Sequence, residues 1–145
     1  MDNAFKYVKT DGICLESDYP YTSGGGNAPS CDSSCAKVEG TKGVTYTDVA
    51  NSEAALMAAV AQQPVSVAVD ADSNWQLYKG GILTTVSGTA LDHGVLAVGY
   101  ASDYWKIKNS WASTWGENGY IRIARSDQKN GPCGVTSSAS YPTFA

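Results

Sequence analysis

Apolar and polar positions alternate most clearly in the second half of the chain. His93–Tyr100, Tyr104–Lys108 and Gly119–Ala124 either alternate or run apolar, with turns between them, which is typical of β-strands. Val65–Val69 predicts one earlier strand with two apolar faces. One face of the later strands carries the apolar side chains of Trp105, Ile107, Ile121 and Ile123, and the other carries the charges of Lys106, Lys108 and Arg122. The pattern therefore predicts an antiparallel sheet with one buried face.

Helical spacing appears earlier in the chain. Apolar residues recur at helical intervals over Met1–Thr10, and Gly12 is a natural stop. Asn51 or Ser52 can cap a second helix that runs to about Gln63, before Pro64. The remaining expected elements are a loop over Leu15–Asn27, a short strand within Gly40–Val49 and a helical turn over Trp75–Tyr78. Helices first and a sheet later indicate an α+β fold.

The composition limits the classes of function. Of the 145 residues, 43% are hydrophobic and 17% charged, which supplies enough apolar material for a core. The net charge of -4, with no Lys/Arg-rich run, argues against a nucleic-acid partner. No apolar run approaches the roughly 20 residues that a membrane helix needs, so we predict no membrane partner.

The chain has four cysteines, three of them near its start. An even count in a small acidic chain favours disulfides and an oxidising compartment. Cys14, Cys31 and Cys35 could also supply three thiolates to zinc, but their spacing matches no standard zinc pattern. We therefore predict neither a metal nor a cofactor, and treat these three cysteines as disulfide candidates.

His93 is the single histidine, and a lone histidine is usually structural. Its position at the start of an apolar strand is, however, a rigid place to mount a base. Asp92 precedes it, but neighbours along a strand point to opposite faces. Asp92 is therefore not expected to orient the imidazole ring.

A tryptophan-rich segment follows the predicted strand that ends at Lys108. One interpretation of Lys108–Trp111 and Trp115–Tyr120 is a loop that closes a hairpin. The other is a catalytic loop, in which the Asn109 amide accepts the imidazole N–H and indoles shield that bond from water. An amide orients the ring without adding a negative charge, which suits a thiolate–imidazolium pair.

These segments resemble the papain-like cysteine peptidases, in the cathepsin L-like and papain group. Leu91–Tyr100 resembles the strand of the catalytic histidine, and Lys108–Trp111 with Trp115–Tyr120 resembles the asparagine loop. Further segments agree in family order: Asp18–Tyr21, Gln63–Val67, Tyr78–Ile82, Cys133–Val135 and Tyr141-Pro142. The ordered set spans essentially the whole chain and is far more specific than any one motif.

The resemblance implies roles for individual residues. His93 would be the general base and acid, and Asn109 would orient it. Trp111 would cover the bond between them, and Trp115 would line the leaving-group side of the cleft. The main specificity pocket would be built from Ala68, Leu91, Gly94 and Ser138, whose small or apolar side chains suit a bulky apolar substrate residue.

The chain also departs from the family. Nothing in it resembles the Gln-x-x-x-Cys-Gly-Ser-Cys-Trp type of stretch that carries the nucleophile and the oxyanion-hole glutamine. We therefore expect a C-terminal portion of the enzyme, inactive by itself, that supplies the histidine and asparagine but not the cysteine. A substitute nucleophile among the four cysteines is not expected.

The resemblance leaves the disulfides incomplete. The family partner of Cys133 would lie near Ser87, which cannot form a disulfide. One of Cys31 or Cys35 resembles a cysteine whose family partner lies in the absent part. Cys14 is an extra cysteine, for which a local bridge to either Cys31 or Cys35 is open.

The papain-like fold implies a division into residues 1–42, a partial helical left domain, and residues 43–145, a barrel-like right domain. The expected partners are a peptide or protein substrate, a complementary N-terminal segment or second copy of the chain, and cystatin-type inhibitors. A lysosomal, vacuolar or secreted location would fit the acidic pI near 4.7 and the cysteines. Two alternatives are an inactive binding or decoy module and a structural or carbohydrate-binding domain with stacking tryptophans. The last leaves the ordered motifs unexplained.

Overall fold

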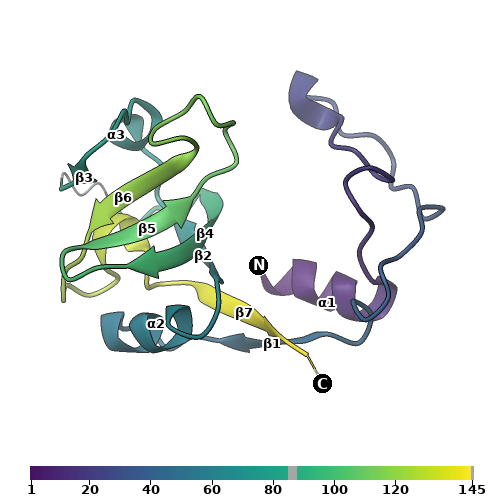
Figure 1. Ribbon diagram of the computed structural model, residues 1–145, viewed down its shortest axis with the longest axis horizontal. Coiled ribbons are helices and arrows are strands. Elements are labelled where there is room, and N and C mark those ends of the chain that lie inside the picture. Colours follow the sequence, from purple (N-terminus) through teal and green to yellow (C-terminus); the bar gives the residue numbers. More distant parts are fainter. Residues whose placement is uncertain (85–87, 145) are drawn as a thin grey trace. The chain divides into compact units, whose positions relative to one another are not determined.

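The computed structural model describes residues 1–84 and 88–144, which form two compact units. The sheet unit comprises Thr47–Tyr141 together with Met1. The helix–loop unit comprises Asp2–Tyr46 and the C-terminal residues from Pro142. Figure 1 shows strands β2 to β6 with helices α2 and α3 in the sheet unit, and α1 followed by a long loop in the helix–loop unit. The division predicted at residues 42 and 43 stays a prediction.

Short helices and single strands alternate from β1 to β3, and strands β4, β5 and β6 then follow one another without a helix between them. Their order is α1 (Asp2–Asp11), η1 (Ser23–Gly25), β1 (Thr45–Asp48), α2 (Glu53–Val60), β2 (Val65–Val69), α3 (Ser73–Gln76), β3 (Ile82–Leu83), β4 (His93–Tyr100), β5 (Tyr104–Lys108), β6 (Tyr120–Ala124), η2 (Pro132–Gly134) and β7 (Ala139–Thr143). The prediction of an α+β chain is confirmed. The predicted bounds of β2, β4 and β5 match the observed ones.

One sheet contains all seven strands in the order β1-β7-β2-β4-β5-β6-β3. Strand β2 pairs antiparallel with β4 and β7, and β4, β5 and β6 continue as an antiparallel meander. The short strand β3 was not predicted, and it pairs parallel with β6. The antiparallel pairing that the sequence predicts for the longer strands therefore does not extend to this short edge strand.

The hydrophobic core lies within the sheet unit. Trp105, Ile107, Ile121 and Ile123 are fully buried, which confirms the predicted apolar face of β5 and β6. Helix α2 contacts β4 and adds Leu56 to the same core. On the opposite face Lys106 and Lys108 are exposed as predicted. Arg122, on the same face, is only partly exposed, because its guanidinium forms an ion pair with Glu117 at 2.6 Å.

Helix α2 begins where its capping residue predicts. The Ser52 hydroxyl accepts a hydrogen bond from the Ala55 backbone N–H at 3.2 Å, which satisfies one of the free donors of the first turn. The helix ends at Val60 rather than near Gln63. Gln62 and Gln63 donate their backbone N–H groups to Ala59 O in a closing turn.

The helix–loop unit has little core of its own. Helix α1 contains no buried residue, and Gly12 ends it at a φ of 75°, as predicted. Among the described residues of this unit, the large exposed hydrophobic side chains are Tyr7, Ile13, Leu15, Tyr19, Tyr21 and Phe144. This unit therefore exposes a large share of its apolar side chains.

Cys14 forms its disulfide with Cys35, one of the two partners that the sequence left open. The predicted counterpart of Cys133 near Ser87 lies outside the described residues, which exclude 85–87. No helix among residues 1–84 and 88–144 is long and apolar enough to cross a membrane.

Candidate functional site

The meander brings the two principal candidate residues together. His93 is the first residue of β4, and Asn109 directly follows the last residue of β5. Because β4 and β5 are antiparallel, with Leu96 opposite Lys108, the start of β4 lies beside the end of β5. Two residues separated by 16 positions in sequence thus meet at the same end of two neighbouring interior strands.

The side chains of His93 and Asn109 are joined by a hydrogen bond. The distance between His93 Nε2 and Asn109 Oδ1 is 2.8 Å, and the Ser110 backbone N–H donates to the same oxygen at 2.8 Å. Because a backbone N–H can only donate, the amide atom facing both partners is the oxygen. Nε2 must therefore carry a hydrogen, and in the neutral ring Nδ1 is the basic nitrogen.

One tryptophan packs on the His93 ring, and a second packs on the first. The Trp111 ring stacks on the His93 ring at a centroid distance of 4.9 Å and an interplanar angle of 25°. Trp115 meets Trp111 edge to face at 5.3 Å and 82°, and its indole N–H donates to Gln76 O at 3.2 Å. Asn109 is only 9% exposed. Shielding from water strengthens the His93–Asn109 interaction.

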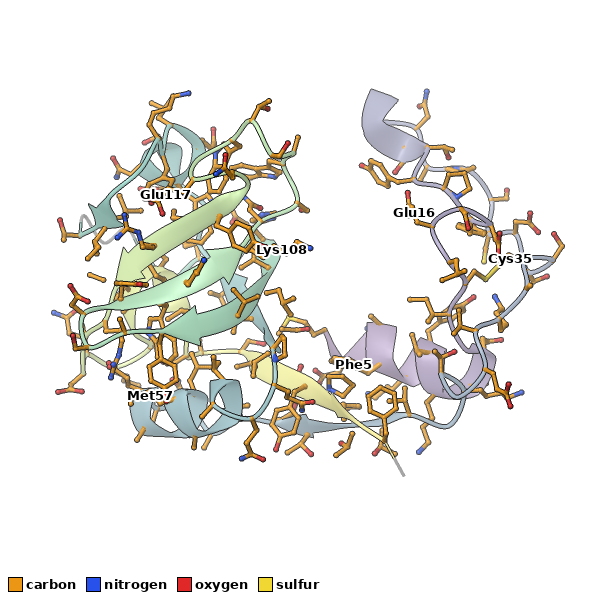
Figure 2. The ribbon with its side chains drawn as sticks, viewed as in Figure 1. Phe5, Glu16, Cys35, Met57, Lys108 and Glu117 are labelled. Atoms are coloured by element: carbon orange, nitrogen blue, oxygen red, sulfur yellow. A yellow bond between two sulfur atoms is a disulfide. The ribbon has the colours of Figure 1, made fainter. Side chains whose placement is uncertain are left out.

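Three residues that form a linked group next to Trp115 are not identifiable from the sequence pattern: Tyr78, Glu117 and Arg122. We call this group the support of Trp115. The Tyr78 ring packs on Trp115 at 5.7 Å, and its hydroxyl donates to Gly81 O at 2.6 Å and accepts from the Arg122 backbone N–H at 3.2 Å. Glu117, labelled in Figure 2, accepts from the Gly81 backbone N–H at 2.9 Å and binds Arg122 through both carboxylate oxygens. Tyr78–Ile82 and Trp115–Tyr120 carried the family resemblance, but only the fold reveals that they contact each other.

Charge pairing dominates the electrostatics of this support. The hydrogen bonds from Arg122 hold the pKa of Glu117 at about 2, well below its usual value of 4.5. The same pairing raises the pKa of Arg122. Burial raises the pKa of the Tyr78 hydroxyl. Glu117 and Arg122 are therefore both charged across the whole range in which a papain-like site would work.

Asp92 has a different partner from His93. Its Oδ1 accepts the Ala71 backbone N–H at 2.9 Å, and its own N–H donates to Val69 O at 3.1 Å. These bonds tie the start of β4 to the end of β2. This placement agrees with the expectation that Asp92 does not orient the imidazole.

The four residues assigned to a specificity pocket are only partly brought together. Ala68 lies directly opposite Gly94 in the β2–β4 ladder, and the Ala68 backbone N–H donates to Ser138 O at 2.9 Å. Leu91 precedes β4 and is 37% exposed, and its Cδ2 lies 2.6 Å from the point that a Cβ on Gly134 would occupy. The assignment of these four residues to one pocket stays a prediction.

The arrangement can hold and move a proton. An imidazole with its Nε2–H fixed and Nδ1 available can deprotonate a neighbouring thiol, hydroxyl or water. Cys133, the cysteine of the sheet unit, is buried within η2 rather than at the start of an α-helix. Among the described residues no cluster of three or more His, Cys, Asp or Glu side chains could hold a metal ion.

Comparison with known proteins agrees with this geometry. The family model "Papain family cysteine protease" matches residues 1–143. The chain is 51% identical over 152 residues to the senescence-specific cysteine protease SAG39 of Oryza sativa, covering 99% of this chain and 43% of the relative. It is 45% identical to the senescence-specific cysteine protease SAG12 of Arabidopsis thaliana, again covering 43% of that relative. The chain thus spans less than half the length of these relatives.

Solved structures show the same fold. The crystal structure of the Carica candamarcensis cysteine protease CMS1MS2, in complex with E-64, is 43% identical, with a TM-score of 0.87 over 99% of this chain and 67% of that one. The bromelain protease from Ananas comosus, in complex with the E64 inhibitor, gives 36% identity and a TM-score of 0.84. By sequence and by structure, this chain belongs to the papain family of cysteine proteases.

Proposed function

We propose that this chain supplies the histidine and asparagine of a Cys-His-Asn site in a cysteine endopeptidase, while the nucleophilic cysteine comes from a segment outside residues 1–145. The observation that carries the proposal is the 2.8 Å bond between His93 Nε2 and Asn109 Oδ1. It leaves Nδ1 of the neutral ring as the base that takes the thiol proton. The resulting thiolate attacks the peptide carbonyl, and the imidazolium returns the proton to the leaving amine.

The surroundings of this pair support the same roles. Stacking on Trp111 and the buried Asn109 amide hold one orientation of the ring, as a general base requires. The amide adds no second negative charge beside a thiolate–imidazolium pair. Trp115 would border the leaving-group side. The small positions Ala68, Gly94 and Ser138 with Leu91 would accept a bulky apolar substrate residue.

In this proposal the nucleophilic cysteine lies outside residues 1–145, whereas in an enzyme that is active by itself it would be one of the chain's own cysteines. Cys14 and Cys35 are consumed in a disulfide, and Cys133 is buried. A complementary segment with a cysteine at a helix N-terminus would supply the thiolate. As in the papain family at large, a vacuolar or secreted setting and peptide-like or proteinaceous inhibitors would fit such an enzyme.

Incubation of the purified chain with a thiol and a fluorogenic dipeptide substrate at mildly acidic pH tests the first half of the proposal. We expect no turnover and no stoichiometric labelling by a thiol-directed epoxide. Turnover that both the epoxide and His93→Ala abolish would overturn the proposal, because one of the four cysteines would then be the nucleophile.

Complementation tests the second half. The part of the mature rice relative that this chain does not match is added, either unchanged or with its active-site cysteine replaced by serine. Turnover is expected only with the cysteine-bearing segment. It should fall by a factor of roughly 100 or more for His93→Ala, by less for Asn109→Ala, and remain unchanged for the exposed Lys129→Ala. A complex that forms without turnover would instead favour the inactive binding or decoy module.

A further inference from the structure

The loop between β5 and β6, residues 109–119, reaches both members of the proposed catalytic pair. Along the backbone, the Asn109 N–H donates to Gly119 O at 2.9 Å, so the end of the loop closes on the residue that binds His93. Through its ring, Trp115 contacts the tryptophan that stacks on His93. Two routes therefore connect the conformation of this loop to the orientation of the imidazole.

The end of this loop is a tight turn. Gly116, Asn118 and Gly119 all have positive φ, of 55°, 55° and 89°. A non-glycine residue in the left-handed region stays there only where its surroundings hold it. Within the turn, the Glu117 N–H donates to Tyr120 O at 2.9 Å, and the Tyr120 N–H donates to Glu117 O at 3.1 Å. These two bonds close the turn, and a side chain attaches it to the neighbouring strands.

The Glu117 carboxylate, labelled in Figure 2, makes that attachment. Its Oε1 accepts the Gly81 N–H at 2.9 Å, and its two oxygens accept from the Arg122 guanidinium at 2.6 and 2.9 Å. Gly81 precedes β3 and Arg122 lies on β6, so one carboxylate joins the turn to two parallel strands. Gly81 O in turn accepts from the Tyr78 hydroxyl, whose ring packs on Trp115.

We propose that Glu117 is a positioning residue of the site, which acts through its turn on Asn109 and so holds the His93 ring with a hydrogen on Nε2. The carboxylate acts through other residues rather than on the imidazole directly. Its bonds fix Gly119 O, which receives the Asn109 N–H, and the face that Trp115 presents to its neighbour. Without them, we expect the bond between His93 and Asn109 to open more often. The effect on turnover rests on the proposed function, whereas the effect on the ring does not.

A second ion pair in the sheet unit provides a matched control. Arg125 and Glu53 Oε1 are 2.7 Å apart, close to the 2.6 Å of the Glu117 pair. Arg125 lies over the Tyr100 ring, at the other end of β4 from His93. The Glu53 side chain is the more buried of the two carboxylates, 11% exposed against 29%, so its loss should destabilise the unit at least as much. General loosening would therefore appear with either substitution, and a positioning effect only with that of Glu117.

The single histidine makes the readout unambiguous. The full chain is labelled with ¹⁵N, and long-range ¹H–¹⁵N NMR at pH 8 shows which ring nitrogen of His93 carries the hydrogen and how fast that hydrogen exchanges with water. For the unchanged chain and for Glu53→Gln, we expect the hydrogen on Nε2. Glu117→Gln should populate both tautomers and raise the exchange rate about tenfold. Arg122→Gln, which keeps the bond to Gly81, should change both in the same direction by less.

Turnover is the second readout. In the protease complemented as above, Glu117→Gln should lower kcat about tenfold and leave KM within about twofold, because a misplaced base slows the chemistry rather than binding. Glu53→Gln should change neither. If the unchanged chain gives no turnover, the proposed function fails, while the NMR comparison still decides the role of Glu117.

Two results would overturn this role of Glu117. One is an unchanged tautomer and exchange rate in both Glu117→Gln and Arg122→Gln, or an equal change in Glu53→Gln. The other is a rise in KM with kcat unchanged in Glu117→Gln, since the carboxylate would then act on substrate binding and not on the base.

Discussion

The sheet unit and the helix–loop unit maintain their structures by different means. Every residue of the hydrophobic core cluster lies between Leu56 and Ala139, within the sheet unit, and many of these side chains are fully buried. In the helix–loop unit, α1 has no buried residue, and Val44 is the one buried hydrophobic side chain among the described residues. That unit instead has the Cys14–Cys35 disulfide and a few backbone hydrogen bonds.

The contrast follows from how much apolar surface each unit can bury. A seven-stranded sheet with helix α2 against it removes enough apolar area from water to offset the entropy of ordering the chain. A single helix with a long loop does not, and small units of this kind commonly depend on disulfides or partners. The candidate site residues His93 and Asn109 belong to the better packed unit, where orientation is most rigidly fixed.

A matched pair of leucines gives the largest expected difference between the units. Leu56 is fully buried, whereas Leu15 is 56% exposed. Leu56→Ala should reduce the free energy of unfolding by about 2–5 kcal/mol, since it leaves a cavity, and Leu15→Ala should change it by less than about 0.5 kcal/mol. Urea unfolding followed by tryptophan fluorescence measures this, because all four tryptophans lie in the sheet unit. Equal losses for the two variants would contradict the contrast.

A matched pair of glycines gives the next effect. Gly116 and Gly26 both have positive φ, 55° and 90°. A Cβ at Gly116 would lie 2.6 Å from the Tyr120 backbone oxygen, whereas one at Gly26 would meet nothing within 4 Å. Gly116→Ala should therefore cost about 1–3 kcal/mol beyond Gly26→Ala in the same unfolding measurement. It should also disturb the Tyr78–Trp115 contact, seen as a shift in tryptophan emission. An unchanged spectrum with unchanged stability would remove Gly116 from the support of the site.

The pH dependence of stability gives the smallest effect. Since the folded pKa of Glu117 is about 2 and its ordinary value is 4.5, its ion pair contributes stability above pH 4.5, and this contribution is lost as the pH falls toward 2. After solvent screening of this partly exposed pair, the loss should be on the order of 1 kcal/mol. Glu117→Gln should reduce the dependence of the free energy of unfolding on pH between pH 4.5 and pH 2, so that the curve of stability against pH is flatter there. Glu16→Gln, in the helix–loop unit, should leave the tryptophan-reported curve unchanged, and equal flattening by both would refute the assignment to Glu117.

Much of the sheet could be predicted because its strands carry strong local patterns. The bounds of β4 and β5 and the buried face of β5 and β6 follow from alternation, and the Ser52 cap follows from its side-chain chemistry. Strand β3 was missed, because two residues are too short to show a period and its partner β6 is remote in sequence. Strand β7 was missed as well, since it contains Pro142 and its pairing with β2 is non-local.

The sequence by itself determined the family, the identity of the candidate pair His93 and Asn109, and the strands that carry them, because these depend on residue types in local order. Only the tertiary structure decided that Nε2 faces the amide oxygen, since that depends on the register of β4 against β5. It also decided that Cys14 bonds to Cys35, and that Glu117, Arg122 and Tyr78 join beneath Trp115. Such contacts link positions far apart in the chain, and no local pattern of hydrophobicity or charge encodes which of them meet.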